Sequence, residues 1–280
     1  MKKHIFLLYF FVLFVHGLSA AEVNFFKLDK IVSNPHASLL RSQAIEAQYI
    51  YSADDEKHYM GFNFGAKIPF LTVMADNLLQ FEMGGYGGIY TRFELFSETF
   101  DFIAADFLGA CYFDFKYRLV SFETSVYHVS SHLGDNYIDE TGSAVRNTGY
   151  EAVREYFIIK GAEFFDLSLG FEYKFLKRPE SKIFNSQSVF HGWRFDFISM
   201  GVPLFFEWEC EIVDLKNIPN IGMRLGIYVD YIFNRFFLGK DHYRKHYHEL
   251  SFHYYYGFSK FACFYNQREN LILVGFSFRL

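Results

Sequence analysis

The sequence predicts an all-β protein, a transmembrane antiparallel up-and-down β-barrel of about 12 strands, within a range of roughly 10 to 14. Three observations predict this fold: apolar and polar residues alternate in short segments, aromatic residues make up 22% of the chain, and the chain opens with an export signal. In the final segment, Val274, Phe276 and Phe278 share one face, and Gly275 and Ser277 share the other. A period of two indicates a β-strand, and so many aromatic residues indicate an outer wall that meets lipid.

The first 21 residues have the order of a secretory signal peptide. Lys2 and Lys3 form a basic start, the run from Ile5 to Val15 is apolar, and Leu18 to Ala21 supply small residues for cleavage. This apolar run is too short to cross a bilayer as a helix, since about 20 residues are needed. We therefore predict that residues 1–21 are removed on export.

The remaining chain is predicted to hold one barrel domain. Residues 22–43 lack the alternation and are predicted to form a periplasmic segment or a small plug, whereas residues 44–280 form the barrel. No later stretch approaches the ~18 apolar residues that indicate a membrane-spanning helix. The strand-like segments are 44–51, 59–68, 78–96 (one strand or two), 100–117 (one or two), 122–131, 150–161, 167–176, 193–200, 204–213, 221–233, 247–256, 258–265 and 271–280.

A soluble β-sandwich is the structural alternative. It would need far fewer Phe and Tyr, and it gives no reason for tyrosines near strand ends such as Tyr90, Tyr117 and Tyr150, which fit the aromatic girdles of a barrel. Carboxylates on the opposite face from the aromatic residues, with Arg194 and Arg224 as partners, predict a polar interior. These carboxylates are Glu82, Glu172, Glu207, Glu209 and Glu211.

The composition also limits the partners. A formal net charge of −5 gives no basic surface for nucleic acid. The three cysteines are an odd number at scattered positions and do not predict a disulfide framework or a metal-ligand set. The chain ends in an amphipathic strand containing Phe278, similar to the signal through which the barrel-assembly machinery recognises outer-membrane barrels, although Leu280 replaces the usual final aromatic residue.

One segment carries residues suited to chemistry. In the strand predicted over 122–131, His128 and Ser130 share a face with Phe122 and Val126, so this face meets lipid. The strand leads into a long polar loop, and long loops of such barrels are extracellular. A polar pair at this place is costly unless it is satisfied and used. We therefore predict that His128 and Ser130 lie near the external edge of the barrel.

Ser130 and His128 can form a nucleophile and base, because side chains two residues apart in a strand point the same way. A histidine base needs a third group to fix its tautomer, and Asn147 is the first candidate, followed by Glu140 and Asp135. Two alternatives remain open. In the first, His128 and Ser130 have a purely structural role and cap the loop. In the second, His128, His132 and Asp135 bind a metal, which requires the chain to turn at Ser131.

His128-Val129-Ser130 resembles the His-x-Ser of two outer-membrane lipid hydrolases, phospholipase A and the lipid A deacylase. Both families usually follow the serine with Asn, whereas this chain has Ser131. The resemblance implies that the site acts on outer-membrane lipids. It also implies a calcium ion near the acidic loop of Asp135 and Asp139, and a homodimer.

Residues 128–135, His-Val-Ser-Ser-His-Leu-Gly-Asp, are similar to the hallmark of a family of uncharacterised bacterial outer-membrane proteins. Glu normally follows the Asp in that family, and Asn136 stands here. This likeness extends loosely over most of the mature chain. It implies location in the bacterial outer membrane and no activity.

Together these features predict an outer-membrane barrel that hydrolyses an acyl ester of a phospholipid or lipid A at the outer leaflet. Ser130 would be the nucleophile, His128 the base, and Asn147 or Glu140 the orienting group. The alternative is a non-catalytic barrel, either a structural protein of the outer membrane or a small pore, in which the motif orders an external loop.

Overall fold

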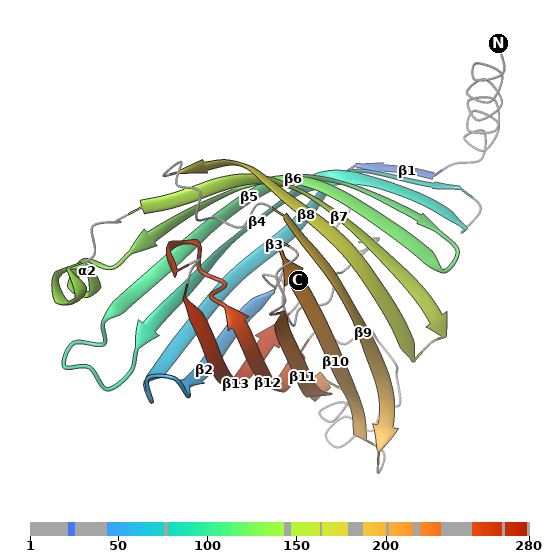
Figure 1. Cartoon of the computed structure of the whole chain (residues 1–280). Coiled ribbons are helices and arrows are strands. Elements are labelled where there is room, and N and C mark those ends of the chain that lie inside the picture. The colour runs from blue at the N-terminus through green and yellow to red at the C-terminus, as the bar shows by residue number, and fades with distance from the viewer. Residues whose placement is uncertain are drawn as a thin grey trace.

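The structure is a computed structural model in which the chain forms a closed antiparallel barrel (Figure 1). It describes residues 22–25, 44–75, 78–142, 147–162, 164–178, 187–199, 202–214, 219–230, 248–264 and 267–278. The barrel strands are β2 (Ile45–Ser52), β3 (His58–Ala75), β4 (Leu79–Glu94), β5 (Phe102–Tyr117), β6 (Val120–Leu133), β7 (Asn147–Ala162), β8 (Phe165–Arg178), β9 (Gln187–Ser199), β10 (Val202–Val213), β11 (Asn220–Tyr228), β12 (His248–Phe258) and β13 (Arg268–Phe278). Among the described residues, no helix is long and apolar enough to span a bilayer.

Each barrel strand pairs with its neighbours in the sequence, and β13 pairs with β2 to close the ring. The predicted 12-stranded, up-and-down barrel is therefore confirmed. Short helix α2 (Asp135–Thr141) lies in the β6–β7 connection, at the opposite end of the barrel from the short strand β1 (Glu22–Phe25) (Figure 1). We name these ends the α2 end and the β1 end.

Strand β1 lies beyond the closed ring, against the part of β3 that extends past β2. Its residues pair antiparallel with β3, from Glu22 opposite Met74 to Phe25 opposite Leu71. This strand falls within the segment 22–43, for which the sequence predicts a periplasmic segment or a small plug. Residues 1–21, the predicted signal peptide, and residues 26–43 lie outside the described part of the chain.

Most predicted strands correspond to observed ones, with one clear error. The segments 78–96 and 100–117 each form one long strand, β4 and β5, rather than two. The strand predicted over 258–265 is wrong, because β12 ends at Phe258 and a single 3₁₀ turn, η3 (Ala262–Phe264), follows it. The aromatic residues of this segment instead belong to a connection that packs into the barrel and buries Phe261 and Phe264.

The barrel interior is lined by paired charges, as the sequence predicts. Arg224 lies 3.1 Å from Glu249 and 3.7 Å from Glu207, and Arg194 also binds Glu207. Other interior ion pairs are Lys67 with Glu123 at 3.0 Å, Arg154 with Glu172 at 3.0 Å, and Arg92 with Glu269 at 2.6 Å. Because buried charges are costly unless paired, these bridges satisfy the groups that fill the interior.

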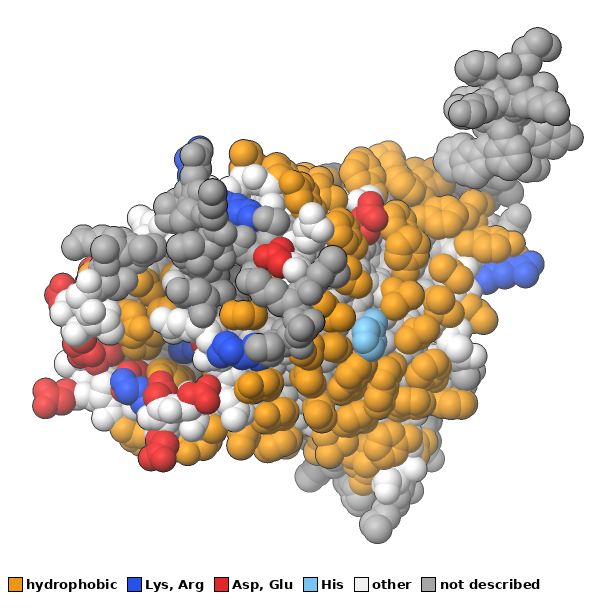
Figure 2. Space-filling model, viewed as in Figure 1, with side chains coloured by type: hydrophobic (Ala, Val, Ile, Leu, Met, Phe, Trp, Pro, Cys, Tyr) orange, Lys and Arg blue, Asp and Glu red, His pale blue; other side chains and the backbone are white. Residues whose placement is uncertain are grey.

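The outer wall is apolar. Figure 2 shows hydrophobic side chains over most of the barrel wall on the visible face, with charged side chains gathered toward the α2 end. Large apolar side chains that are about half exposed include Phe64, Val126, Leu225 and Phe252, from strands on different sides of the ring. Such a band suits contact with lipid, whereas it would be unfavourable in water.

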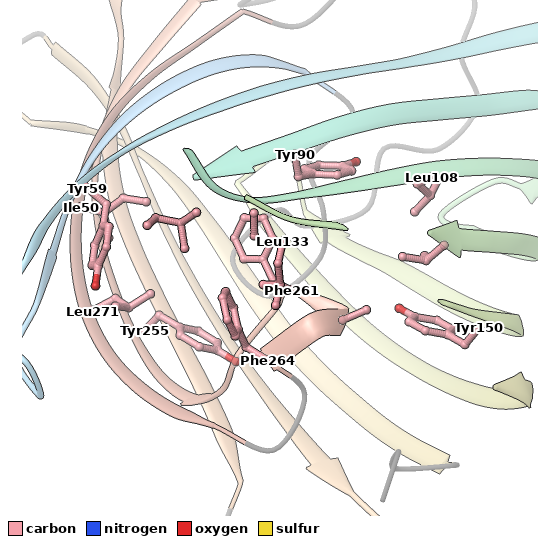
Figure 3. Close-up of a cluster of buried hydrophobic side chains, with 14 of the residues drawn as sticks. Ile50, Tyr59, Tyr90, Leu108, Leu133, Tyr150, Tyr255, Phe261, Phe264 and Leu271 are labelled. Carbon is pink, nitrogen blue, oxygen red and sulfur yellow. The ribbon is translucent and has the colours of Figure 1, made fainter. Parts of the chain in front are cut away.

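The β12–β13 connection forms part of the hydrophobic core inside the barrel. Phe261 and Phe264 lie among buried residues of several strands, including Tyr59, Leu133 and Tyr255 (Figure 3). Backbone hydrogen bonds fix the connection to the wall: Ala262 N–H donates to Asp106 Oδ2 at 3.1 Å, and Cys263 N–H donates to Ser131 Oγ at 3.1 Å. The connection therefore fills part of the interior at the α2 end, next to a cavity lined by residues that include Tyr90, Arg92 and Phe261.

Candidate functional site

The candidate site lies on the outer wall where β6 and β7 reach the α2 end. Along β6 the odd-numbered residues from Ser121 to Leu133 are buried, and the even-numbered ones face outward. His128, Ser130 and His132 therefore share the outer face, as predicted for His128 and Ser130. The register places Gly149 of β7 opposite Ser130, and Asn147 opposite His132.

A continuous hydrogen-bonded chain joins three of these side chains. Ser130 Oγ lies 3.0 Å from His132 Nε2, and His132 Nδ1 lies 2.7 Å from Asn147 Oδ1. Since an amide oxygen can only accept, it selects the tautomer in which Nδ1 carries the hydrogen. Nε2 is then free to accept the hydroxyl proton of Ser130. This is the arrangement of a serine nucleophile, a histidine base and an orienting group.

The structure places His128 outside this chain. Its Nδ1 lies 3.8 Å from Glu151 Oε1, and its side chain is 58% exposed, on the side of Ser130 away from Asn147. In a strand, the residue two positions before a serine and the residue two positions after it face the same way, so alternation alone cannot distinguish His128 from His132. The predicted strand ended at residue 131, whereas β6 continues to Leu133 and thereby places His132 on the face of Ser130.

The other predicted site residues lie in or near α2. Glu140 acts electrostatically on Lys57 of the β2–β3 connection, so Asn147 is the candidate third group that contacts a histidine. Asp135 and Asp139 stand on α2, and no group of three His, Cys, Asp or Glu side chains in the described part of the chain is arranged to hold a metal ion. The predicted calcium therefore finds no such ligand set there.

Helix α2 is fixed to the neighbouring β4–β5 connection. Asn136 Nδ2 donates a hydrogen bond of 2.6 Å to Asp101 Oδ1. Hydrogen bonds from Thr99 and then Asn136 lower the pKa of Asp101 below its usual value. Asn136, which replaces the Glu of the motif, can donate to a carboxylate where an ionised Glu could not.

Aromatic and small residues surround the serine and histidine. The ring of Phe107, opposite Ser130 on β5, meets the His132 ring edge-on at a centroid distance of 5.7 Å. A Cβ placed on Gly149 would lie 2.9 Å from the Val129 carbonyl oxygen, so a larger side chain is excluded opposite Ser130. This leaves the outer side of Ser130 accessible between its neighbouring strands.

The inner side of the same wall is supported by the β12–β13 connection. Ser131, next to Ser130, faces inward and accepts the hydrogen bond from Cys263. Burial raises the pKa of the Cys263 thiol to about 12, so this cysteine is a poor nucleophile. The interior contact therefore has a structural role behind the outer site.

A comparison with known protein families shows which family this chain belongs to. The family model described as "Protein of unknown function (DUF1207)" matches residues 29–280. The chain belongs to the DUF1207 family. The predicted membership of an uncharacterised family is thus confirmed, and no curated protein matches the sequence of this DUF1207 protein.

Solved structures with the same fold are outer-membrane barrels. The outer membrane phospholipase A from Escherichia coli is 11% identical, with a TM-score of 0.58 over 90% of this chain and 95% of that chain. The Salmonella typhi outer membrane phospholipase, described as a dimer with bound calcium, is 10% identical, with a TM-score of 0.59 over 88% of this chain and 94% of that chain. A KdgM porin matches at 8% identity with a TM-score of 0.43, over 85% and 99% of the two chains. At these identities, the matches to the phospholipases show a shared fold.

Proposed function

We propose that this DUF1207 protein is a hydrolase of lipid acyl esters in the outer leaflet of the bacterial outer membrane. Ser130 is the nucleophile, His132 is the general base, and Asn147 orients His132. The observation that carries the proposal is the chain of two hydrogen bonds, 3.0 and 2.7 Å long, on the lipid-facing side of the barrel. His132 replaces His128 as the base in this proposal.

The fold supports the location. Four of the five connections at the β1 end have two or three residues, whereas those at the α2 end have five or more. Short turns are periplasmic and longer loops extracellular in bacterial outer-membrane barrels. The α2 end then faces outward, and Ser130 lies near the level at which ester groups join the headgroups of a lipid to its acyl chains.

The reaction follows from the geometry. Ser130 Oγ attacks the ester carbonyl carbon while its proton passes to His132 Nε2, and the carbonyl π electrons move to the oxygen. Collapse of this tetrahedral species breaks the ester C–O bond, and His132 returns the proton to the leaving alkoxide. A water molecule, deprotonated by His132, then attacks the acyl-serine carbonyl. As the acyl–Oγ bond breaks and the fatty acid leaves, His132 returns the proton to Ser130 Oγ.

The phospholipases of similar fold support the substrate class and a further expectation. A solved form of the Escherichia coli enzyme is described as an active-site mutant in which an asparagine is replaced by alanine. That description agrees with an asparagine as the third group here. We extend the proposal to a homodimer, which sedimentation of the detergent-refolded protein tests, and to insertion by the barrel-assembly machinery through β13.

Hydrolysis is tested by refolding the protein in detergent and measuring fatty acid released from phospholipid and from lipid A. The intact protein should release fatty acid, and Ser130→Ala should release none above the uncatalysed rate. Ser168→Ala, which removes a buried hydroxyl near the β1 end of β8, is the matched control and should retain activity. Equal release by the intact protein and Ser130→Ala removes Ser130 as the nucleophile.

The alternative is a non-catalytic barrel or small pore. Ion pairs that include Arg224 with Glu249, and the packed β12–β13 connection, fill much of the described interior and argue against an open channel. Stepwise conductance in a planar lipid bilayer, together with no esterase activity, would favour the pore.

A further inference from the structure

We propose that a groove on the outer wall beside Ser130 binds the acyl chain of the substrate and limits its length. This inference rests on the proposed hydrolase and names the part of the lipid that the site selects. The groove crosses β2 to β5, outside the barrel. Its lining includes Ile45, Phe64, Ala66, Gly87, Ile89 and Phe107.

One side of the groove is a ridge of large apolar side chains in register. Phe64 of β3 lies opposite Ile89 of β4, and Ile89 lies opposite Phe107 of β5. The next residue in this row, opposite Phe107, is Ser130. The ridge therefore leads directly to the proposed nucleophile. Each of its three large side chains is about half exposed and faces outward.

The floor of the groove runs parallel to this ridge, two residues away along each strand. Ala66 pairs with Gly87, Gly87 pairs with Gly109, and Gly109 pairs with His128. A Cβ built on Gly109 would meet no atom within 4 Å, so the space beside His128 is open. The floor thus continues the groove as far as the outer face of β6.

The contact between Phe107 and His132 keeps this path open. The Phe107 ring packs edge-on against His132, on the side of Ser130 away from Gly109. An ester whose carbonyl carbon lies at Ser130 can therefore place its acyl chain over Gly109 and along the ridge. An apolar occupant fits, because the residues of the lining are apolar or glycine and the wall faces lipid.

The dimensions set a preferred length. Three strand spacings of about 4.8 Å separate β6 from β3, which gives a path of about 14 Å. An extended chain of carbon–carbon bonds advances roughly 1.3 Å per carbon, so about 11 carbons reach from Ser130 on β6 to strand β3. A longer chain continues past Ile45 on β2, whereas a very short chain does not enter the groove.

The test measures kcat/KM for butanoate, dodecanoate and hexadecanoate esters in detergent, with the refolded full-length protein. Gly109→Leu should reduce turnover of the two long esters about tenfold or more and leave the butanoate ester within about twofold. Ala66→Leu, at the far end, should reduce the hexadecanoate ester most and the dodecanoate ester less. Leu225→Phe adds similar bulk to the lipid-facing wall of distant β11 and should change none of the three.

Each outcome separates the groove from the reaction itself. Equal losses on all three esters in Gly109→Leu, or unchanged long-chain turnover in both groove variants, would show that lipid tails meet this wall without selection, and would overturn the groove. Heat-dependent migration in electrophoresis confirms that each variant has formed a barrel, and Ala66→Leu decides the question if Gly109→Leu does not. Butanoate hydrolysis that survives Ser130→Ala would instead refute the proposed nucleophile.

Discussion

His132 and Asn147 join the end of one strand to the beginning of the next, through a hydrogen bond of 2.7 Å between Nδ1 and Oδ1. They are 15 residues apart in sequence, with α2 between them, yet they are direct cross-strand partners in the β6–β7 register. The connection can therefore vary without moving the two groups apart, because the sheet register sets their separation.

The two histidines beside Ser130 should differ sharply in their effect on esterase activity. His132→Ala should lower kcat by about 10³-fold or more, since Ser130 then loses the group that accepts its proton. His128→Ala should lower it less than about tenfold, because Glu151 is the contact of His128. Steady-state kinetics with a phospholipid substrate measure both. A larger loss in His128→Ala than in His132→Ala would restore His128 as the base.

Asn147 should act by orienting His132 rather than by contacting the substrate. Asn147→Ala should lower kcat about 10- to 100-fold with little change in KM. Asn147→Asp keeps an acceptor oxygen for Nδ1–H and should recover most of the activity. Glu140→Gln is the matched control on α2 and should leave kcat unchanged. An unchanged kcat in Asn147→Ala would show that the hydrogen bond to Asn147 is not needed.

Arg224 should be important for the stability of the barrel. Its guanidinium faces Glu46, Glu207 and Glu249 inside the ring, so Arg224→Met leaves buried carboxylates without their partner. We expect a loss of about 3–5 kcal/mol in the free energy of unfolding. Urea unfolding in detergent measures it, with Leu225→Ala on the outward face of the same strand as the control. Equal urea midpoints for Arg224→Met and the intact protein would contradict a structural role for this ion-pair network.

The β12–β13 connection should become more stable as the pH rises. Burial lowers the pKa of Lys260 from 10.5 to about 8, although carboxylates such as Glu209 and Glu46 partly oppose the shift. Between pH 8 and 10.5 the unfolded connection binds more protons than the folded one, so its stability increases through this window. Below the pKa of Lys260 in the folded protein, this lysine is charged, and the full free-energy cost of burying the charge remains.

Hydrogen exchange of residues 259–264, expressed as protection factors, measures this effect. The intact protein should show protection that rises between pH 8 and 10, whereas Lys260→Met should show higher protection at pH 7 and little pH dependence. Protection that falls with pH in the intact protein would contradict a neutralised Lys260.

The barrel could be predicted because its wall repeats one physical rule. Apolar and polar residues alternate along β6 and β13 since one face of the wall meets lipid and the other meets paired charges. The same rule predicted that the Ser130 side chain faces outward. The strand prediction fails over 258–265, where Phe261 and Phe264 fill the interior of the barrel instead of alternating along a wall.

The choice between His128 and His132 could not be made from parity. Both lie two residues from Ser130 and both face outward, so a single strand treats them alike. The neighbouring strand distinguishes them, because β7 places Asn147 beside His132 and Glu151 beside His128. Cross-strand register is set by pairing over the whole ring, and a local motif does not contain it.

Because the barrel wall is a single β-sheet, insertions and deletions in its strands are restricted in this family. Inserting one residue into β6 before Ser130 would exchange its two faces, moving the hydroxyl into the enclosed space and turning buried Tyr127 or Val129 toward hydrocarbon. An insertion of two would keep the hydroxyl outside but slide it past Asn147. Length changes in this lineage should therefore accumulate in the connections, while the strand that carries the serine keeps a constant count.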